Sequence, residues 1–167
     1  GLPKVAEVAR MIHAADPQLK NLVTLEESPN VEKLKGWFED VDIVCLRNVT
    51  FDPAQAEKLK QMGKEIWIYV SGPSPPYPTL VLDYPAMAYR LLPWMCWKYG
   101  IKGLLYWSVN YWTKNPYQDT DNTPWGQNQS GVLYYPGPEG PVPSLRLAVF
   151  RDGIEDYEYL AMLQQLI

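Results

Sequence analysis

The stretch Glu65-Ile66-Trp67-Ile68-Tyr69-Val70-Ser71 alternates aliphatic residues with aromatic or polar ones. Successive side chains of a β-strand point to opposite faces, so the alternation predicts one face made of Ile66, Ile68 and Val70 and another made of Trp67, Tyr69 and Ser71. We expect the aliphatic face to pack on helices and the second face to meet a ligand. Outward from this strand, the pattern predicts further strands at 19–25, 41–48 and 101–112, and helices at 4–15, 31–38, 53–63, 85–99 and 144–166.

Strands and helices alternate four times, which predicts an α/β fold with parallel strands joined by right-handed crossovers. Two architectures fit: about four βα units forming the C-terminal half of a (β/α)₈ TIM barrel, or a small open parallel α/β sheet. The long loops 72–85 and 113–143 follow predicted strands and are rich in Tyr, Trp, Asn and Asp. Because barrel active sites are built from loops of this kind, we favour the half-barrel, with residues 1–167 as a single unit.

Composition narrows the range of partners. The 167 residues are 47% hydrophobic with a net charge of −4, and no Lys/Arg cluster indicates a nucleic-acid partner. No apolar run reaches the ~18 residues that span a membrane. Cys45 and Cys96 lie in separate apolar runs and are expected to be buried free thiols, and the single histidine, His13, is expected on a helix face. The sequence therefore predicts neither a metal nor a cofactor.

The segment Gly103-Leu104-Leu105-Tyr106-Trp107-Ser108-Val109-Asn110-Tyr111-Trp112 indicates a carbohydrate ligand, because aromatic faces cover the apolar side of a sugar ring while hydroxyl and amide groups orient it. A strand with large core aromatics is the alternative interpretation. In a regular strand, Trp107 lies on the face opposite Tyr106 and Asn110. A bulge would turn Trp107 and Tyr111 toward the ligand. The candidate sugar-binding residues are Tyr69, Tyr106, Trp107, Asn110, Tyr111, Trp112 and Trp125.

Several motifs in consistent order resemble one family over nearly the whole chain. They are Trp67-Ile68-Tyr69-Val70, Asp83-Tyr84-Pro85, Gly103-Leu104-Leu105-Tyr106-Trp107, Asn110-Tyr111-Trp112 and Arg151-Asp152-Gly153-Ile154-Glu155-Asp156-Tyr157-Glu158-Tyr159. The family is the DUF4091 domain, the catalytic barrel of glycoside hydrolase family 123, the β-N-acetylgalactosaminidases. The resemblance implies an N-acetylhexosamine glycoside as substrate, with Tyr69 bonded to the acetamido group and Trp112 or Trp125 stacked on the ring. By the family alone, the protein is expected in a bacterial periplasm or outside the cell.

The resemblance also implies a retaining, substrate-assisted mechanism that uses an adjacent Asp-Glu pair. This sequence contains no Asp-Glu dipeptide. We therefore expect the chain to begin just after the strand that bears the pair, and to contain no catalytic residue. Glu26-Glu27, Glu39-Asp40 and Glu155-Asp156 are interpreted as turn or helix-surface residues, and Asp83 is predicted to N-cap the helix that starts near Pro85.

Two other functions remain open. In the first, the chain is a non-catalytic carbohydrate-binding module that uses Trp107, Tyr111, Trp112 and Trp125. In the second, it is a structural half-barrel. A half-barrel would expose strand edges, which favours self-association or pairing with a missing N-terminal half. Two details are also predicted: Gly153 makes a close packing contact inside its helix, and Gln129-Ser130-Gly131, where the family more usually has Gly-Asp-Gly, binds differently.

Overall fold

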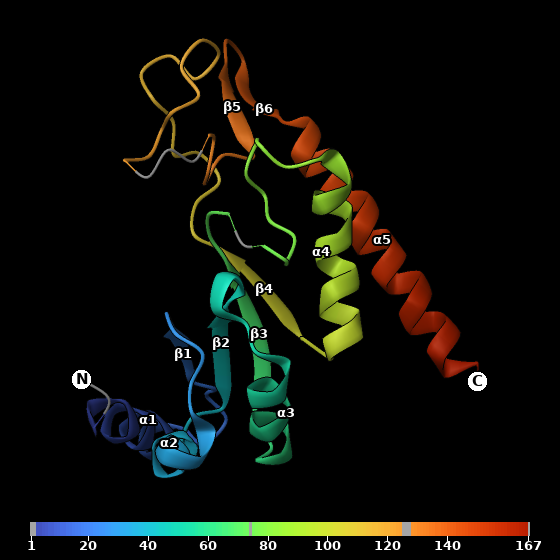
Figure 1. Ribbon diagram of the computed structural model, residues 1–167. Helices are drawn as coiled ribbons and strands as arrows, with labels where there is room; N and C mark the ends of the chain where they lie inside the picture. The colour runs from blue at the N-terminus through green and yellow to red at the C-terminus, as the bar shows by residue number, and fades with distance from the viewer. Residues whose placement is uncertain (1–2, 74, 125–127, 167) are drawn as a thin grey trace. The chain divides into compact units, whose positions relative to one another are not determined.

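The computed structural model describes residues 3–73, 75–124 and 128–166 (Figure 1). Its helices are α1 (Pro3–Ala15), α2 (Val31–Phe38), α3 (Pro53–Gln61), α4 (Ala86–Tyr99) and α5 (Leu145–Gln165), with a short 3₁₀ helix η1 (Asn48–Thr50). Its strands are β1 (Leu22–Leu25), β2 (Ile43–Arg47), β3 (Glu65–Val70), β4 (Gly103–Tyr106), β5 (Tyr134–Gly137) and β6 (Gly140–Pro143). The order β1-β2-β3-β4 forms a parallel sheet, which confirms the predicted α/β fold.

The chain divides into two compact units. One comprises Gly1–Tyr69 with Ile101–Leu105, and the other comprises Val70–Gly100 with Tyr106–Ile167. The first unit thus contains α1, α2, α3 and most of the parallel sheet, whereas the second contains α4, α5 and the β5-β6 hairpin.

The first unit has the two-faced β3 strand that the sequence predicts. Ile66 and Ile68 are fully buried, and Trp67 and Tyr69 between them are half-buried. Trp67 lies against β4 at Gly103, where an added Cβ would overlap the indole ring. The Trp67 Nε1 donates to Glu65 Oε1 at 2.7 Å, which fixes the ring in this position. Gly103 is therefore required by a close approach of a side chain.

Of two N-caps predicted from the sequence, the one at α3 is confirmed and the one at α4 is wrong. Asp52 accepts from the backbone N of Ala54 and of Gln55, with Pro53 in the first turn, as the sequence predicts. Asp83 does not cap α4, because that helix begins at Ala86 with Pro85 as its N-cap. Asp83 instead accepts from Asn128 Nδ2 at 2.6 Å and from Asn128 N at 3.2 Å.

Two boundaries after β3 were predicted wrongly. The fourth strand ends at Tyr106, whereas the alternation of residue types predicted Trp112 as its end. Beyond Tyr106 the backbone pairs with residues 131–134 instead of continuing in the sheet: Val109 O accepts from the N of Leu133 and of Tyr134. The loop predicted at 113–143 contains the β5-β6 hairpin, in which prolines obscured the strand pattern.

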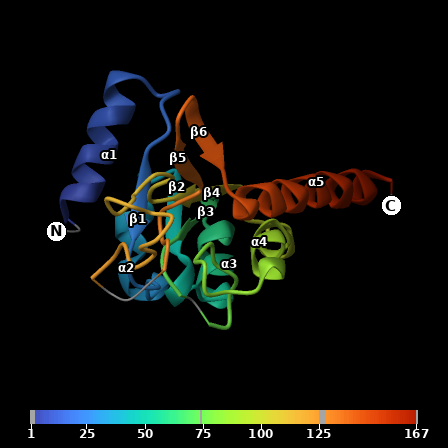
Figure 2. The same ribbon diagram turned by 90° about the horizontal axis from the view of Figure 1, so that it is seen from above.

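Helices α4 and α5 lie side by side in the second unit (Figures 1 and 2). Gly153 is the point of close approach, because an added Cβ would overlap the backbone carbonyl of Arg90. Beside it, Asp156 accepts from Arg90 Nε at 2.6 Å, from Arg90 Nη2 at 2.8 Å and from Trp94 Nε1 at 2.9 Å. The predicted close contact at Gly153 is confirmed.

We expect Gly153→Ala to lower the free energy of unfolding by about 1–2 kcal/mol, because overpacking against a backbone atom outweighs the better helix propensity of alanine. Gly36→Ala is the matched control. Gly36 lies in α2 with nothing near its Cβ position, so the same substitution there should raise stability by about 0.5–1 kcal/mol. Urea unfolding of the three proteins measures both changes, and equal effects at the two positions would contradict the packing argument.

Candidate functional site

In the first unit, the predicted site residue Tyr69 lies next to the last residue of β3. Its register partner is Arg47, the last residue of β2. Burial raises the pKa of Tyr69, the charge of Glu26 raises it further, and Arg47 acts in the opposite direction. The phenol is thus protonated at neutral pH and able to donate a hydrogen bond.

In the second unit, Tyr106 and Trp107 are anchored to one short segment, Ser130-Gly131. The Tyr106 hydroxyl oxygen accepts from Gly131 N at 2.7 Å, and Trp107 Nε1 donates to Ser130 Oγ at 3.3 Å. Burial raises the pKa of Tyr106. Gly131 has φ +76° and its Cα faces the Trp107 ring, so a side chain there would meet the indole. These two aromatics are therefore held firmly from one side.

The next aromatics are more open. Tyr111 is 48% exposed and its ring centroid lies 4.8 Å from that of Trp107, at an interplanar angle of 58°. Trp112 is 36% exposed, and its Nε1 donates to Tyr134 O at 2.6 Å. Asn110 is exposed and forms a β-bridge with Val132. The structure brings together Tyr106, Trp107, Asn110, Tyr111 and Trp112 on one segment, while Trp125 lies outside the described residues.

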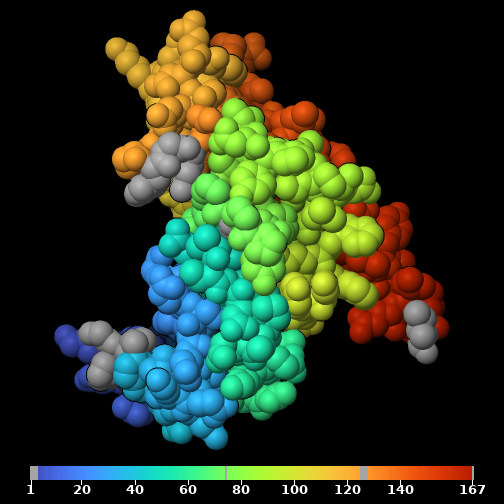
Figure 3. Space-filling model, viewed as in Figure 1, coloured from blue at the N-terminus to red at the C-terminus, as the bar shows by residue number. Residues whose placement is uncertain are grey.

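The segment 129–134 that holds these aromatics was not predicted to do so. Asn122 also contributes, because its Nδ2 donates to Tyr111 O at 2.6 Å and to Ser130 O at 2.7 Å. Tyr117 adds an exposed ring 5.3 Å from that of Tyr135, with its hydroxyl donating to Pro136 O at 3.0 Å. The loop between Trp112 and β5 forms much of the orange surface in Figure 3, its described parts being 113–124 and 128–133. Asparagine and tyrosine in a long loop carry no sequence signal that reveals such backbone contacts.

Arg146 is a buried cation beneath this segment and was also missed. It is 3% exposed, and its Nη1 donates to Leu80 O at 2.9 Å and to Gln129 O at 2.7 Å. Its Nη2 lies 3.4 Å from the Tyr135 hydroxyl. A signal was present, since a cation in the first turn of a helix opposes the helix dipole and so indicates another partner.

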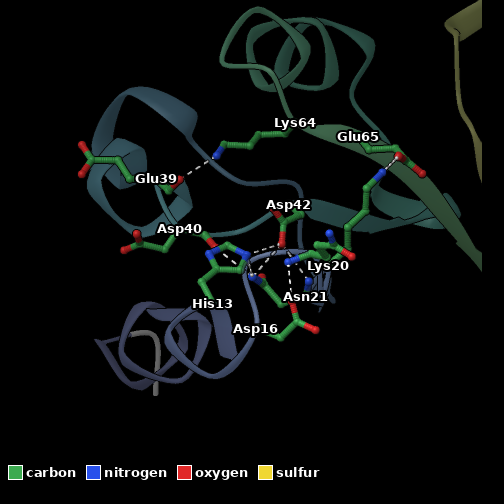
Figure 4. Close-up of polar contacts among 10 residues, drawn as sticks. His13, Asp16, Lys20, Asn21, Glu39, Asp40, Asp42, Lys64 and Glu65 are labelled. Carbon is green, nitrogen blue, oxygen red and sulfur yellow. Dashed lines mark hydrogen bonds and ion pairs between the residues drawn. The ribbon is translucent and has the colours of Figure 1, made fainter. Parts of the chain in front are cut away.

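A polar cluster lies at the opposite, N-terminal ends of the strands in the first unit, where His13, Asn21 and Asp42 point toward one another (Figure 4). Asp42 Oδ2 lies 2.8 Å from His13 Nε2 and accepts from both the N and the Nδ2 of Asn21, also at 2.8 Å. His13 lies on α1, so the cluster ties that helix to the start of β2. In a parallel α/β fold, groups at this end serve stability.

We expect Asp42→Asn to lower the free energy of unfolding by about 1 kcal/mol at neutral pH, because it removes the charge from three hydrogen bonds. Burial would raise the pKa of Asp42, but the hydrogen bonds from Asn21 and His13, with the charges of His13 and Lys64, lower it below 3.8. A depressed carboxyl pKa stabilises the fold above the unfolded-state pKa, and this contribution is lost as the pH falls below 3.8. Urea midpoints should therefore differ between wild type and variant at about pH 7, and the difference should shrink as the pH falls through the lowered pKa of Asp42 in the folded protein. A constant difference would contradict the assignment.

The remaining titratable groups of the described residues were compared with the requirements of a metal site. Among residues 3–73, 75–124 and 128–166, no three His, Cys, Asp or Glu side chains are placed to hold an ion. Cys45 and Cys96 are buried free thiols as predicted, and burial raises their pKa to about 11 and about 12. Within the same described ranges, no helix combines the length and apolar character needed to cross a bilayer.

Comparison with family models places the chain in a family of glycoside hydrolases. The matching model is the catalytic domain of glycoside hydrolase family 123, over residues 2–163, and the chain belongs to this family. This confirms the resemblance seen in the sequence. A search of curated proteins found no match.

Proposed function

We propose that this chain supplies the sugar-binding part of a glycoside hydrolase that acts on N-acetylhexosamine glycosides, with β-N-acetylgalactosaminides as the preferred class. Membership of glycoside hydrolase family 123 supports the reaction type. The observation that carries the sugar-binding role is the segment Tyr106–Trp112, in which Tyr106 and Trp107 are anchored from below and Tyr111 and Trp112 are exposed. Preformed aromatic surfaces bind sugar rings without ordering new side chains.

Each proposed residue has a role that matches its environment. The Trp112 indole N–H is already used by Tyr134 O, so the face of the ring is the part that meets a sugar. Asn110 offers an amide donor and acceptor to sugar hydroxyls. Tyr69 donates its phenol proton to the carbonyl of the 2-acetamido group. Trp107 and Tyr106 support this surface, and Trp125 is proposed to stack on the ring as well.

The proposed reaction is retaining and substrate-assisted. The acetamido carbonyl oxygen attacks the anomeric carbon, the glycosidic bond breaks, and a general acid protonates the departing oxygen. Water then opens the oxazolinium and restores the acetamido group. We assign neither acid nor base to this chain, because the sequence has no Asp-Glu dipeptide and Asp156 is bound to Arg90 and Trp94. Residues 1–167 are proposed to be the C-terminal part of a barrel whose preceding part supplies the acids.

Sugar binding by the whole chain tests this proposal. Trp112→Ala should raise the Kd for N-acetylgalactosamine about tenfold, a loss of about 1.4 kcal/mol, because the stacking surface is removed. Tyr159→Ala is the control, since Tyr159 is an aromatic exposed on α5, and it should leave the Kd unchanged. Titration calorimetry measures both, and an unaltered Kd in Trp112→Ala would overturn the pocket assignment.

A non-catalytic carbohydrate-binding module is the second candidate, and it is favoured because, within the part of the chain that the structure describes, Tyr106, Trp107 and Trp112 are anchored by Gly131, Ser130 and Tyr134 and not by a carboxylate. Turnover separates the two. We expect the chain alone not to release p-nitrophenol from p-nitrophenyl N-acetylgalactosaminide, and joining it to the preceding barrel strands should restore release. If the longer protein binds the sugar but does not cleave it, the binding module is the correct function.

A further inference from the structure

Three side chains from neighbouring strands form a row at the C-terminal edge of the parallel sheet. Leu25 pairs with Leu46 and Arg47 pairs with Tyr69, so Glu26, one position after β1, comes beside Arg47. By strand alternation Arg47 and Tyr69 share the face that also bears Trp67. Active sites of parallel α/β folds are built at this edge. Of these three residues, only Tyr69 was predicted to bind a ligand.

Direct contacts hold Glu26 in place within this row. Arg47 Nη1 donates to Glu26 Oε2 at 2.8 Å, and Thr50 Oγ1 donates to the backbone O of Glu26 at 2.9 Å. Glu26 is nevertheless 70% exposed, and Arg47 is 32% exposed. The charges of both residues act on Tyr69. The Glu26 carboxylate is thus paired with Arg47, open to solvent, and near enough to Tyr69 for its charge to act on the phenol.

Stability does not account for this arrangement, because exposed ion pairs typically contribute little to folding. Recognition of a sugar accounts for the arrangement better, for the following reason. An ionised carboxylate accepts hydrogen bonds at about four positions, so an arginine contact on one oxygen leaves acceptor capacity on the other. Sugar hydroxyls are donors, and hydrogen bonds to a charged acceptor are roughly twice as strong as neutral ones.

We propose that Glu26 is a further sugar-binding residue, whose carboxylate accepts hydrogen bonds from hydroxyl groups of the sugar held by Tyr69, and that Arg47 is its positioning residue. This inference rests on the proposed function, because the ligand of Glu26 is the sugar that the proposed function assigns to Tyr69. The pair adds a charged acceptor near the neutral phenol of Tyr69 in the first unit. Selectivity for a correctly placed hydroxyl follows, since an analogue that lacks it leaves the carboxylate without its partner.

Titration calorimetry of the full chain with N-acetylgalactosamine tests the role of Glu26. Glu26→Gln should raise the Kd about tenfold, because the charged acceptor is lost while the size is kept. Glu32→Gln is the matched control: Glu32 is 72% exposed and paired with Lys58 at 3.1 Å, but lies on α2. This control should leave the Kd unchanged, and both variants should keep the urea midpoint of the wild type.

Deoxy analogues of N-acetylgalactosamine, each lacking one hydroxyl, separate recognition from a structural role. At least one analogue should bind the wild type about tenfold more weakly than the parent sugar, and this difference should disappear in Glu26→Gln. Arg47→Met should weaken binding, and the Glu26→Gln/Arg47→Met double variant should lose no more than Glu26→Gln alone, because Arg47 acts through Glu26.

The outcomes distinguish the two proposals. If the wild type binds no N-acetylgalactosamine, the proposed function fails and this inference fails with it. If the wild type binds the sugar and responds to Trp112→Ala, but Glu26→Gln behaves like Glu32→Gln, only the inference is overturned. Additive losses in the double variant would overturn the positioning role of Arg47.

Discussion

Arg146→Met should lower the free energy of unfolding by about 3 kcal/mol, one of the two largest losses that we expect of any single substitution in this chain. Methionine fills a similar volume, so the loss comes from hydrogen bonds. Arg146 Nη1 bonds the carbonyls of Leu80 and Gln129, and both residues are fully buried. Two buried acceptors would lose their charged donor, at about 1–3 kcal/mol each.

Arg151→Met is the control on the same helix. Arg151 lies five positions further along α5 and pairs with Asp152 and Glu155 at the surface. Its loss should change the urea midpoint little, because surface ion pairs are weak. Arg146→Lys keeps the charge but not the planar fork, so it should fall between the wild type and Arg146→Met. If the two methionine variants unfold at the same urea concentration, Arg146 does not support this part of the fold.

The fold was largely predictable because its signals are local. Helix α3 starts at Pro53 because the Asp52 side chain accepts from the backbone N of Ala54 and of Gln55. Helix α2 has the predicted limits, Val31 and Phe38. In β3, buried and half-buried side chains alternate as the sequence predicted. Each of these features depends on neighbours within one turn or one strand, so the sequence contains the information directly.

The candidate site was only partly predictable, because its contacts join distant segments. Trp107 and Tyr111 were predicted to lie in the same strand as Tyr106, regular or bulged, yet Val109 O bonds Leu133 and Tyr134 across more than twenty residues of loop. Asp83 has the spacing of a helix cap but bonds Asn128 instead. The assignment of sugar-binding side chains from residue types stays a prediction, whereas the partner of each backbone group depends on loop closure, which residue types do not reveal.

Gly131→Ala should also lower the free energy of unfolding by about 3 kcal/mol, from two separable causes. Gly131 has φ +76°, a left-handed conformation that is unfavourable for alanine by about 1–2 kcal/mol. In addition, its Cβ would lie 2.5 Å from the Trp107 ring. That ring cannot easily move away, because Ser130 Oγ binds its Nε1 and Tyr111 packs on it.

Gly63→Ala isolates the second cause. Gly63 has nearly the same backbone conformation, φ +77°, but nothing lies within 4 Å of its Cβ position. The control should therefore cost only the backbone strain, about 1–2 kcal/mol as at Gly131, and the excess in Gly131→Ala measures the overlap with Trp107. Urea unfolding followed by tryptophan fluorescence gives both values, and displacement of Trp107 should also change the native-state emission in Gly131→Ala alone. Equal losses in the two variants would show that Trp107 is free to move, and a ring that moves freely would not present Tyr111 as a fixed surface to a sugar.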